Sequence, residues 1–243
     1  MTGDEQRRDL AAAAARTLRA AIEALDLSML PHPPPVAPPM VDAPQLAPAV
    51  APAAVAVDLE TLTAQVAACT LCPLHQSRTR TVFGEGRVTT DALACQVMFV
   101  GEGPGYNEDQ TGRPFVGAAG ELLDKIIIAM KLRREDCYIT NIVKCRPPEN
   151  ATPTPDQFGA CKPYLVRQIE RVRPRFLVAL GAPAGQVLTG KPDSVIRMRG
   201  RLHRWGDIPL VVTYHPAALL RNAEYKRPAW ADLQLVMARL RNG

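Results

Sequence analysis

The sequence lacks any long apolar stretch. No apolar run approaches the roughly 20 residues that a helix needs to cross a bilayer, although 47% of the residues are hydrophobic. The opening residues, MTGDEQRRDL, also lack the basic and then apolar profile of a secretory signal. No internal repeat is evident. We therefore expect a cytoplasmic protein with one sizeable core and no membrane contact.

Charge is spread unevenly along the chain. Residues 1–58 contain four basic and seven acidic residues, whereas the rest of the chain contains 25 basic and 17 acidic residues, a balance of +8. A basic domain of this kind is compatible with a polyanionic partner such as nucleic acid.

The beginning of the chain differs in composition from the rest. Residues 9–27 combine strong helix formers with an apolar stripe, which predicts a short helix within an N-terminal extension of residues 1–30. Residues 31–52 include nine prolines in an alanine and valine background, a composition that favours extended, unpacked chain. We interpret residues 31–57 as a disordered Pro/Ala-rich linker and residues 58–243 as the functional domain. The extension is a candidate for recruiting a protein partner.

Beyond the linker, apolar strand patterns alternate with amphipathic helix patterns. This alternation is typical of a parallel sheet covered by helices on both faces, and it predicts an α/β fold: a three-layer α/β/α sandwich with a central, mostly parallel four-stranded sheet. The predicted strands cover residues 96–102, 137–143, 175–181 and 209–215. The predicted helices cover residues 118–131, 154–172, 182–189 and 228–241.

Polar or glycine residues stand at the end of each predicted strand. They are Glu102 with a glycine-rich loop, Asn141, Gly181 and His215. Open parallel sheets bind ligands beyond the carboxyl ends of their strands. We therefore expect these positions, distant in sequence, to converge on one crevice.

The chain has six cysteines, Cys69, Cys72, Cys95, Cys137, Cys145 and Cys161. A reducing cytoplasm disfavours disulfides between them. The first two have the spacing that lets both thiolates bind one metal centre, and the last two flank a stiff, proline-rich loop that loses less entropy when it closes around a metal. These four thiolates fit either a structural zinc ion or a 4Fe–4S cluster, and their spacing does not distinguish the two. The remaining pair lies at strand starts, so we interpret it as buried, inert thiols.

The glycine-rich loop, within residues 100–125, follows the first predicted strand and precedes a helix. It lacks the Lys-Ser/Thr end of a P-loop and the spacing of a dinucleotide fingerprint, and Glu102 would repel phosphate at short range. A carboxylate here is better suited to orient water or to stabilise a cationic transition state. Phe115 lies between glycines of this segment, where its ring can either stack on a flat ligand or pack in the core.

Two further side chains suit a base-binding site. Asn141 offers a donor and an acceptor, which complement the O4 and N3–H edge of uracil, although asparagine at a strand end is also a common cap. His215 precedes a proline after the last strand, so we expect its ring in a loop, where a lone histidine is often structural. Leu219, Leu220 and Arg221 follow, an apolar and basic run that could wedge into a base stack or meet phosphate.

At these residues the chain resembles the family 4 uracil-DNA glycosylases, the iron–sulfur branch of the uracil-DNA glycosylase superfamily. The resemblance covers about residues 60–240 and rests on the segments CTLCPL, TVFGEG, GEGPG, GRPFVG, YITNIVKCRPP and HPAALLRN. It implies a DNA repair hydrolase that flips uracil out of DNA, cleaves its N-glycosidic bond and leaves an abasic site. It also implies a 4Fe–4S cluster that orders loops near the DNA, with the ligands Cys69, Cys72, Cys145 and Cys161.

Carried over residue by residue, the resemblance assigns a role to each candidate. Phe115 would stack on the flipped uracil, Asn141 would read its Watson–Crick edge, and His215 would donate towards uracil O2. Glu102 is our candidate for stabilising the cationic sugar and positioning water. The backbone of three following residues would line the sugar side: Gly103, Pro104 and Gly105.

The remaining assignments concern the DNA around the base. Leu219 or Leu220 would fill the space that the flipped nucleotide leaves. Phosphates would be held by basic residues, Arg221, Arg197, Arg199 and Arg201. Tyr106 is a candidate for the steric block against the methyl group of thymine. We expect a monomer that acts on uracil-containing DNA, single- or double-stranded.

Two other functions fit parts of the sequence. A noncatalytic iron–sulfur protein that binds nucleic acid or transfers electrons would explain the cysteines and the charge. It would leave Phe115, Asn141 and His215 as structural residues. A nucleotide hydrolase would use the glycine-rich loop, but the sequence lacks the metal-binding Ser/Thr motif that such an enzyme needs.

Overall fold

A computed structural model describes residues 58–90 and 93–242, so the predicted helix at residues 9–27 and the linker at residues 31–57 lie outside the described residues. The described residues form one sheet of six strands: β1 (Glu85–Gly86), β2 (Val97–Gly101), β3 (Cys137–Asn141), β4 (Leu177–Leu180), β5 (Leu202–Trp205) and β6 (Ile208–Thr213). They also form eight α-helices: α2 (Leu59–Ala67), α3 (Tyr106–Thr111), α4 (Ala118–Ala129), α5 (Pro155–Val172), α6 (Ala182–Thr189), α7 (Val195–Met198), α8 (Pro216–Arg221) and α9 (Lys226–Asn242). Short 3-10 helices are η1 (Pro73–Gln76), η2 (Arg134–Asp136), η3 (Pro148–Asn150) and η4 (Ala223–Tyr225). Within this part of the chain, no helix has both the length and the apolar character of a bilayer span.

The four predicted strands are the parallel centre of the sheet. The strand order is β1-β3-β2-β4-β6-β5, in which β3, β2, β4 and β6 run parallel. All residues of β2, β3 and β4 are buried, as expected for strands covered on both faces. The predicted parallel core is therefore confirmed.

The predicted number of strands was wrong, because an antiparallel strand extends the sheet at each edge. β1 pairs with β3, and β5 pairs with β6. β1 has only two residues, and a side chain at Gly86 would collide with the carbonyl oxygen of Cys137, so this strand depends on a close backbone approach rather than on an apolar pattern. β5 and β6 form a hairpin across Gly206 and Asp207, and Gly206 has φ +55°. That glycine–aspartate pair is a hairpin signal, but the strands it joins are not both buried runs, so the apolar pattern alone did not predict β5.

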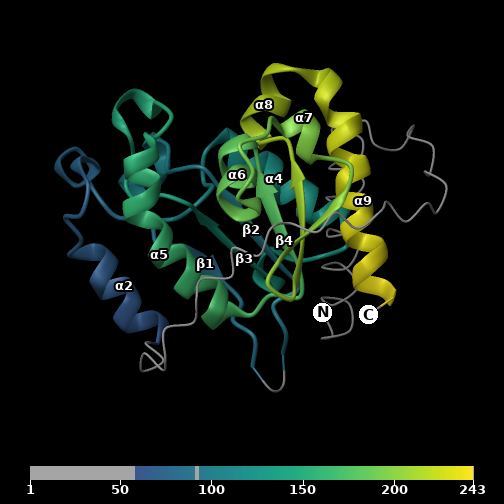
Figure 1. Cartoon of the computed structure of the whole chain (residues 1–243), viewed down its shortest axis with the longest axis horizontal. Coiled ribbons are helices and arrows are strands. Elements are labelled where there is room, and N and C mark those ends of the chain that lie inside the picture. The colour runs from purple at the N-terminus through teal and green to yellow at the C-terminus, as the bar shows by residue number, and fades with distance from the viewer. Residues whose placement is uncertain (1–57, 91–92, 243) are drawn as a thin grey trace, which may run out of the picture.

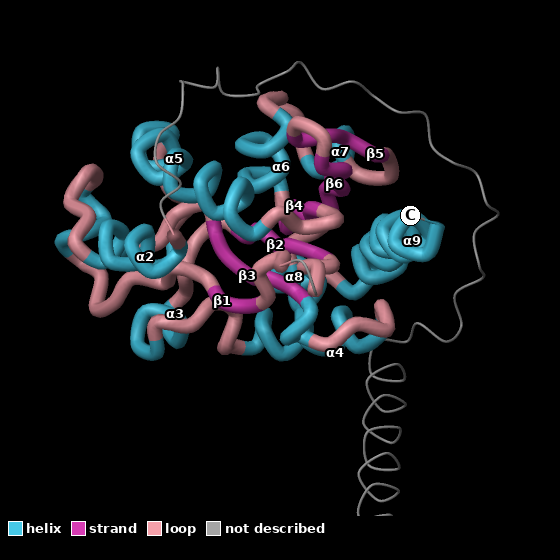
Figure 2. The backbone as a smooth tube through the Cα atoms, turned by 90° about the horizontal axis from the view of Figure 1, so that it is seen from below, coloured by secondary structure: helices cyan, strands magenta, loops and turns pink. Residues whose placement is uncertain are grey.

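Helices cover both faces of the sheet and complete the predicted three-layer sandwich. On one face, apolar side chains of α4, α8 and α9 pack against the sheet, and on the other face those of α5, α6 and α7 do so. Figure 2 shows the sheet between these two helical layers. Figure 1 shows α2 beside α5, away from α9, and Leu62 and Val66 of α2 are buried there.

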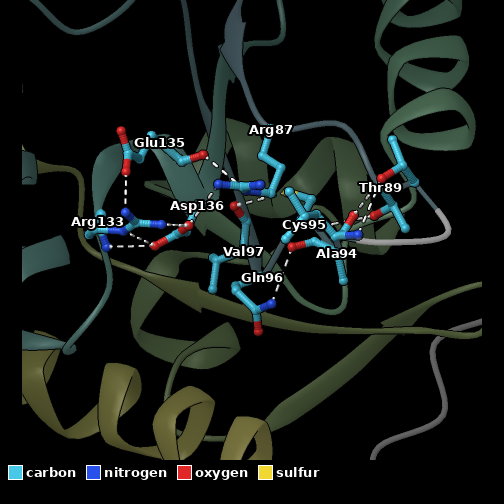
Figure 3. A network of polar contacts seen from close by, with 11 residues as sticks. Arg87, Thr89, Ala94, Cys95, Gln96, Val97, Arg133, Glu135 and Asp136 are labelled. Atoms are coloured by element: carbon cyan, nitrogen blue, oxygen red, sulfur yellow. Dashed lines mark hydrogen bonds and ion pairs between the residues drawn. The ribbon is translucent and has the colours of Figure 1, made fainter.

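A polar network closes the amino ends of the central strands (Figure 3). Asp136, directly before β3, accepts hydrogen bonds from Arg87 Nη2 at 2.9 Å and from Arg133 Nη2 at 2.8 Å. Its main-chain oxygen accepts a hydrogen bond from the N–H of Gln96, directly before β2. Charged side chains thus hold the amino ends of β2 and β3 in register. Loops extend from the carboxyl ends of the same strands.

Candidate functional site

A cavity of about 440 Å³ opens beyond the carboxyl ends of β2, β3 and β6, and we call it the strand-end cavity. Of the candidates from the sequence, the structure brings eight together in its lining: Glu102, Gly103, Pro104, Gly105, Phe115, Asn141, His215 and Arg221. The expected convergence is therefore found for Glu102, Asn141 and His215, at a volume typical of small-molecule sites, whereas Gly181 does not line the cavity. The same wall includes residues that the sequence did not point to: Glu108, Ala119, Pro147, Asn150, Ala151, Thr152, Pro153 and Ala217.

Asn141 forms part of the floor of this cavity. It is the last residue of β3, is 1% exposed, and pairs in register with Gly101 of β2. Its Oδ1 is buried, and no residue in the described part of the chain donates a hydrogen bond to it. A buried acceptor without a partner is unfavourable by about 1–3 kcal/mol. The site is thus built to receive an N–H group from a ligand.

Phe115 holds its ring beside Asn141 in an unusual backbone conformation. Its φ is +53°, a left-handed value that a bulky side chain rarely adopts, and it is 6% exposed. Its ring centroid lies 5.5 Å from that of His215, with the planes inclined by 32°. The packing and stacking roles are therefore compatible, because a core aromatic ring also lines the cavity.

Glu108 fastens the loops that carry these residues. Its Oε1 accepts hydrogen bonds from the N–H groups of Val116 at 2.8 Å and Gly117 at 3.0 Å, next to Phe115. Its Oε2 accepts the Gly105 N–H at 3.1 Å. Gly105 is the N-cap of α3, and Glu108 follows it by three residues. This spacing is the capping-box pattern, which was the sequence signal that could have pointed to Glu108. The Gly105 N–H is consequently engaged within the protein, although the residue lines the cavity.

His215 is the N-cap of α8, and this position determines which ring nitrogen carries the proton. Nδ1 accepts the Ala217 N–H at 3.2 Å, which leaves the hydrogen of a neutral ring on Nε2. His215 is half-buried, and desolvation by the surrounding protein, together with the charge of Arg221, lowers its pKa to about 4, whereas Glu108 opposes the shift. Near neutral pH the ring is therefore an uncharged donor.

Glu102 directly follows β2 in the cavity wall. Burial raises the pKa of this carboxyl above its usual value, and a hydrogen bond with the Thr152 hydroxyl opposes the change. Water therefore solvates the Glu102 carboxylate less well than it would at the protein surface. Because there is less water to screen it, this carboxylate interacts more strongly with a nearby positive charge.

The DNA-contact candidates separate into two groups. Leu219 is 3% exposed and packs in the core, whereas its neighbour Leu220 is 51% exposed. The assignment of Leu219 as a base-stack wedge was wrong, because α8 buries that face of the helix. Arg199 donates to Asp232 Oδ1 at 3.0 Å and Oδ2 at 3.1 Å, so its charge is already paired inside the domain.

Tyr106 does not fit the role proposed for it. Its ring is exposed and lies outside the lining of the strand-end cavity. The guanidinium of Arg146 lies 5.1 Å from the ring centroid instead. Of the other basic candidates, Arg197 and Arg201 are exposed and Arg221 lies at the cavity.

A second, narrow cavity is lined by the four predicted cysteine ligands, Cys69, Cys72, Cys145 and Cys161. Two of them follow α2, one follows β3 and one lies on α5. Arg78 donates to Cys145 Sγ at 3.1 Å, and Lys144 also lines this cysteine cavity. Burial raises the pKa of Cys145 and raises that of Cys161 to about 11, and the charges of Arg78 and Lys144, respectively, oppose these shifts.

The cysteine cavity does not have the arrangement of a single-metal site. Among residues 58–90 and 93–242, no three His, Cys, Asp or Glu side chains are close enough to hold one metal ion. A tetrahedral zinc ion would draw four sulfurs to about 2.3 Å from one point. The four thiols around this common cavity are sulfur donors of the kind that soft metal centres bind.

The other two cysteines are structural. Cys95 and Cys137 are both fully buried in the two cores of the sandwich, and all six cysteines are free thiols. Burial raises the pKa of each of these two thiols to about 12. The prediction that they are buried is confirmed.

Comparisons with known proteins agree with this geometry. The family model of the uracil DNA glycosylase superfamily matches residues 89–234. The chain is 46% identical over 180 residues to the type-4 uracil-DNA glycosylase of Thermotoga maritima, which covers 72% of this chain and 91% of that protein. It is 39% identical over 186 residues to the type-4 uracil-DNA glycosylase of Archaeoglobus fulgidus, with 73% and 91% covered. Identity to a type-5 uracil-DNA glycosylase of Pyrobaculum aerophilum is 30% over 190 residues, with 67% and 83% covered.

Proposed function

We propose that this chain, which belongs to the type-4 group of the uracil-DNA glycosylase superfamily, removes uracil from DNA by hydrolysing its N-glycosidic bond. The observation that carries the proposal is the Oδ1 of Asn141, which is buried at the floor of a cavity with an aromatic wall and has no hydrogen-bond partner among the described residues. Its products are free uracil and an abasic site, and its role is DNA repair.

Recognition of the base follows from three side chains. The N3–H of uracil supplies the hydrogen bond that Asn141 Oδ1 lacks, and the amide nitrogen donates to O4. Phe115 stacks on the pyrimidine face. Cytosine presents an acceptor at N3 and a donor at C4, so it leaves the same amide unsatisfied.

Bond cleavage moves electrons onto the base and leaves a cationic sugar. His215, neutral near pH 7 because its pKa is about 4, donates from Nε2 to uracil O2 as negative charge develops there. It acts by stabilising the leaving base and does not need to transfer a proton. Glu102, as a carboxylate, stabilises the sugar cation and orients the attacking water.

Base extrusion exposes the bond to these groups. Flipping a nucleotide costs a few kcal/mol, and Leu220, an exposed residue of α8, fills the gap in the stack. Arg221, the next residue, lines the strand-end cavity and holds a phosphate beside it. Arg199 takes no direct part in this proposal because Asp232 already pairs with it.

The four cysteines are proposed ligands of a 4Fe–4S cluster. When bound, the cluster supplies iron–thiolate bonds that join the end of α2, the loop after β3 and α5. In the free thiols, burial raises the pKa of Cys161 to about 11, so binding must displace protons. Its role is structural.

A uracil-release assay tests the function. Matched single- and double-stranded oligonucleotides carry uracil, thymine, hypoxanthine or cytosine at one position. We expect free uracil and an alkali-labile site from the uracil substrate. DNA binding without uracil release would instead support the noncatalytic iron–sulfur protein. Phosphate release from nucleotides would support the nucleotide hydrolase. The cytoplasmic location and the monomeric state stay predictions.

The cofactor has its own test. Purified protein should be brown, with broad absorption at the blue end of the visible spectrum and iron bound in stoichiometric amount. A colourless, zinc-loaded protein would overturn the cluster while leaving the glycosylase proposal to the release assay.

A further inference from the structure

Lys144 is a buried lysine between the strand-end cavity and the cysteine cavity. It is 1% exposed, and its Nζ donates to the main-chain oxygen of Asn141 at 2.5 Å and to Thr140 Oγ1 at 2.7 Å. Both acceptors belong to the last two residues of β3. The ammonium therefore closes the end of the strand that carries the uracil-reading side chain.

The charge of Lys144 has no carboxylate partner in the part of the chain that the structure describes. Burial lowers the pKa of Lys144 to about 7, because a buried ammonium without a counter-charge is strongly unfavourable. Lys144 lines the cysteine cavity together with Cys145 and Cys161. These side chains become anionic when they bind metal. Metal-bound cysteines are thus the counter-charge that the surroundings of Lys144 offer.

A hydrogen-bonded network surrounds the ammonium and limits its movement. The Thr140 hydroxyl donates to the Phe83 main-chain oxygen at 2.8 Å, and Gln168 Nε2 donates to the same oxygen at 2.8 Å. Gln168 lies on α5, the helix that also carries Cys161. The Lys144 ammonium and the Thr140 hydroxyl therefore belong to one network, which joins the end of β3 to α5 and to the segment that precedes β1.

We propose that Lys144 is a positioning residue whose ammonium links the charge of the cysteine cavity to the backbone of Asn141, and so holds the Asn141 side chain in register with uracil. The inference rests on the proposed function and on the assignment of the cysteine ligands. Filling the cysteine cavity then supports base recognition directly, in addition to ordering loops.

The test compares K144M and K144R with K125M, which removes an exposed lysine of α4. Two readouts do not require turnover: iron content, and affinity for DNA that carries 2′-fluoro-2′-deoxyuridine, whose glycosidic bond resists cleavage. We expect K144M to lower iron content and to weaken binding to this DNA about 10–100-fold, the range for groups that support metal ligands. Binding to undamaged DNA and all properties of K125M should stay at the wild-type level.

K144R keeps the charge, but its planar guanidinium presents donors in a different geometry. It should therefore retain iron and still bind the fluorinated uracil DNA more weakly than wild type. Wild-type affinity in either Lys144 variant would overturn the link to Asn141, whatever the iron content. If K144M does not fold, K144R decides the question. Failure of the wild-type protein to release uracil would reject the proposed function, and the iron content of K144M would still test the link to the cysteine cavity.

Discussion

Gly101 and Asn141 stand opposite each other on neighbouring parallel strands, and a methyl group on Gly101 would collide with Asn141 Oδ1. It would also lie 2.7 Å from Cζ of Phe115. The missing side chain at Gly101 therefore creates the space in which the amide and the aromatic ring meet a ligand.

Gly101→Ala should close this space. The new methyl displaces Asn141 and Phe115 from the ligand, and a misplacement of about 1 Å can lower a rate about 100-fold. Uracil release is the measurement. The matched control is Gly159→Ala on α5, where a Cβ meets no atom within 4 Å. That variant should keep full activity and gain up to about 1 kcal/mol in free energy of unfolding.

Asn141→Ala should separate function from stability. It removes two hydrogen bonds to uracil, which predicts about a 100-fold loss in uracil release. It also removes a buried acceptor that has no partner among the described residues, so the free energy of unfolding should not fall by more than the loss of packing explains. Urea denaturation and the release assay measure the two effects. Unchanged release would exclude Asn141 from the pocket.

Glu108→Ala should affect substrate binding more than the chemical step. Three main-chain N–H groups lose their acceptor, so we expect about 2 kcal/mol lower stability or more. Phe115 stacks on uracil equally before and during cleavage, so its loosened loop should raise KM about tenfold with little change in kcat. Glu121→Ala, an exposed acid in the first turn of α4, is the control. A wild-type KM in Glu108→Ala would contradict this role.

The low pKa of His215 predicts a pH-dependent stability. Between pH 6.5 and about 4, the unfolded chain protonates this ring while the folded chain keeps it neutral, so the free energy of unfolding should fall as the pH falls through this window. Above pH 6.5 both states are neutral and the contribution is constant. Denaturation of wild type and His215→Gln from pH 4 to 8 measures it. The two curves should diverge only below pH 6.5, and parallel curves throughout would contradict a desolvated, neutral ring.

The adjacent leucines of α8 should respond in opposite ways. Leu219→Ala leaves a cavity in the core and should lower the free energy of unfolding by about 2–5 kcal/mol. Leu220→Ala should leave stability unchanged and slow uracil release from double-stranded DNA more than from single-stranded DNA, since only a duplex leaves a gap to fill. Equal loss on both substrates would remove Leu220 as the wedge.

The sequence by itself determined the parallel centre of the fold. The predicted strands overlap β2, β3, β4 and β6, and the helices predicted between them overlap α4, α5 and α6. Periodic burial is written into local sequence, because a residue's neighbours two or four positions away share its face. Convergence of Glu102, Asn141 and His215 then followed from strand direction alone.

Only the tertiary structure decided which side chains remain available to a ligand. Leu219 and Leu220 are equivalent in the sequence, and contact with the core distinguishes them. Arg199 has the charge to bind phosphate, but it forms an ion pair with Asp232, which lies 33 residues away in the sequence. The sequence around Lys144 does not indicate that this lysine is buried. Its contacts arise only where β3 packs near α5 and the cysteine cavity. Such contacts depend on long-range packing, which no local period encodes.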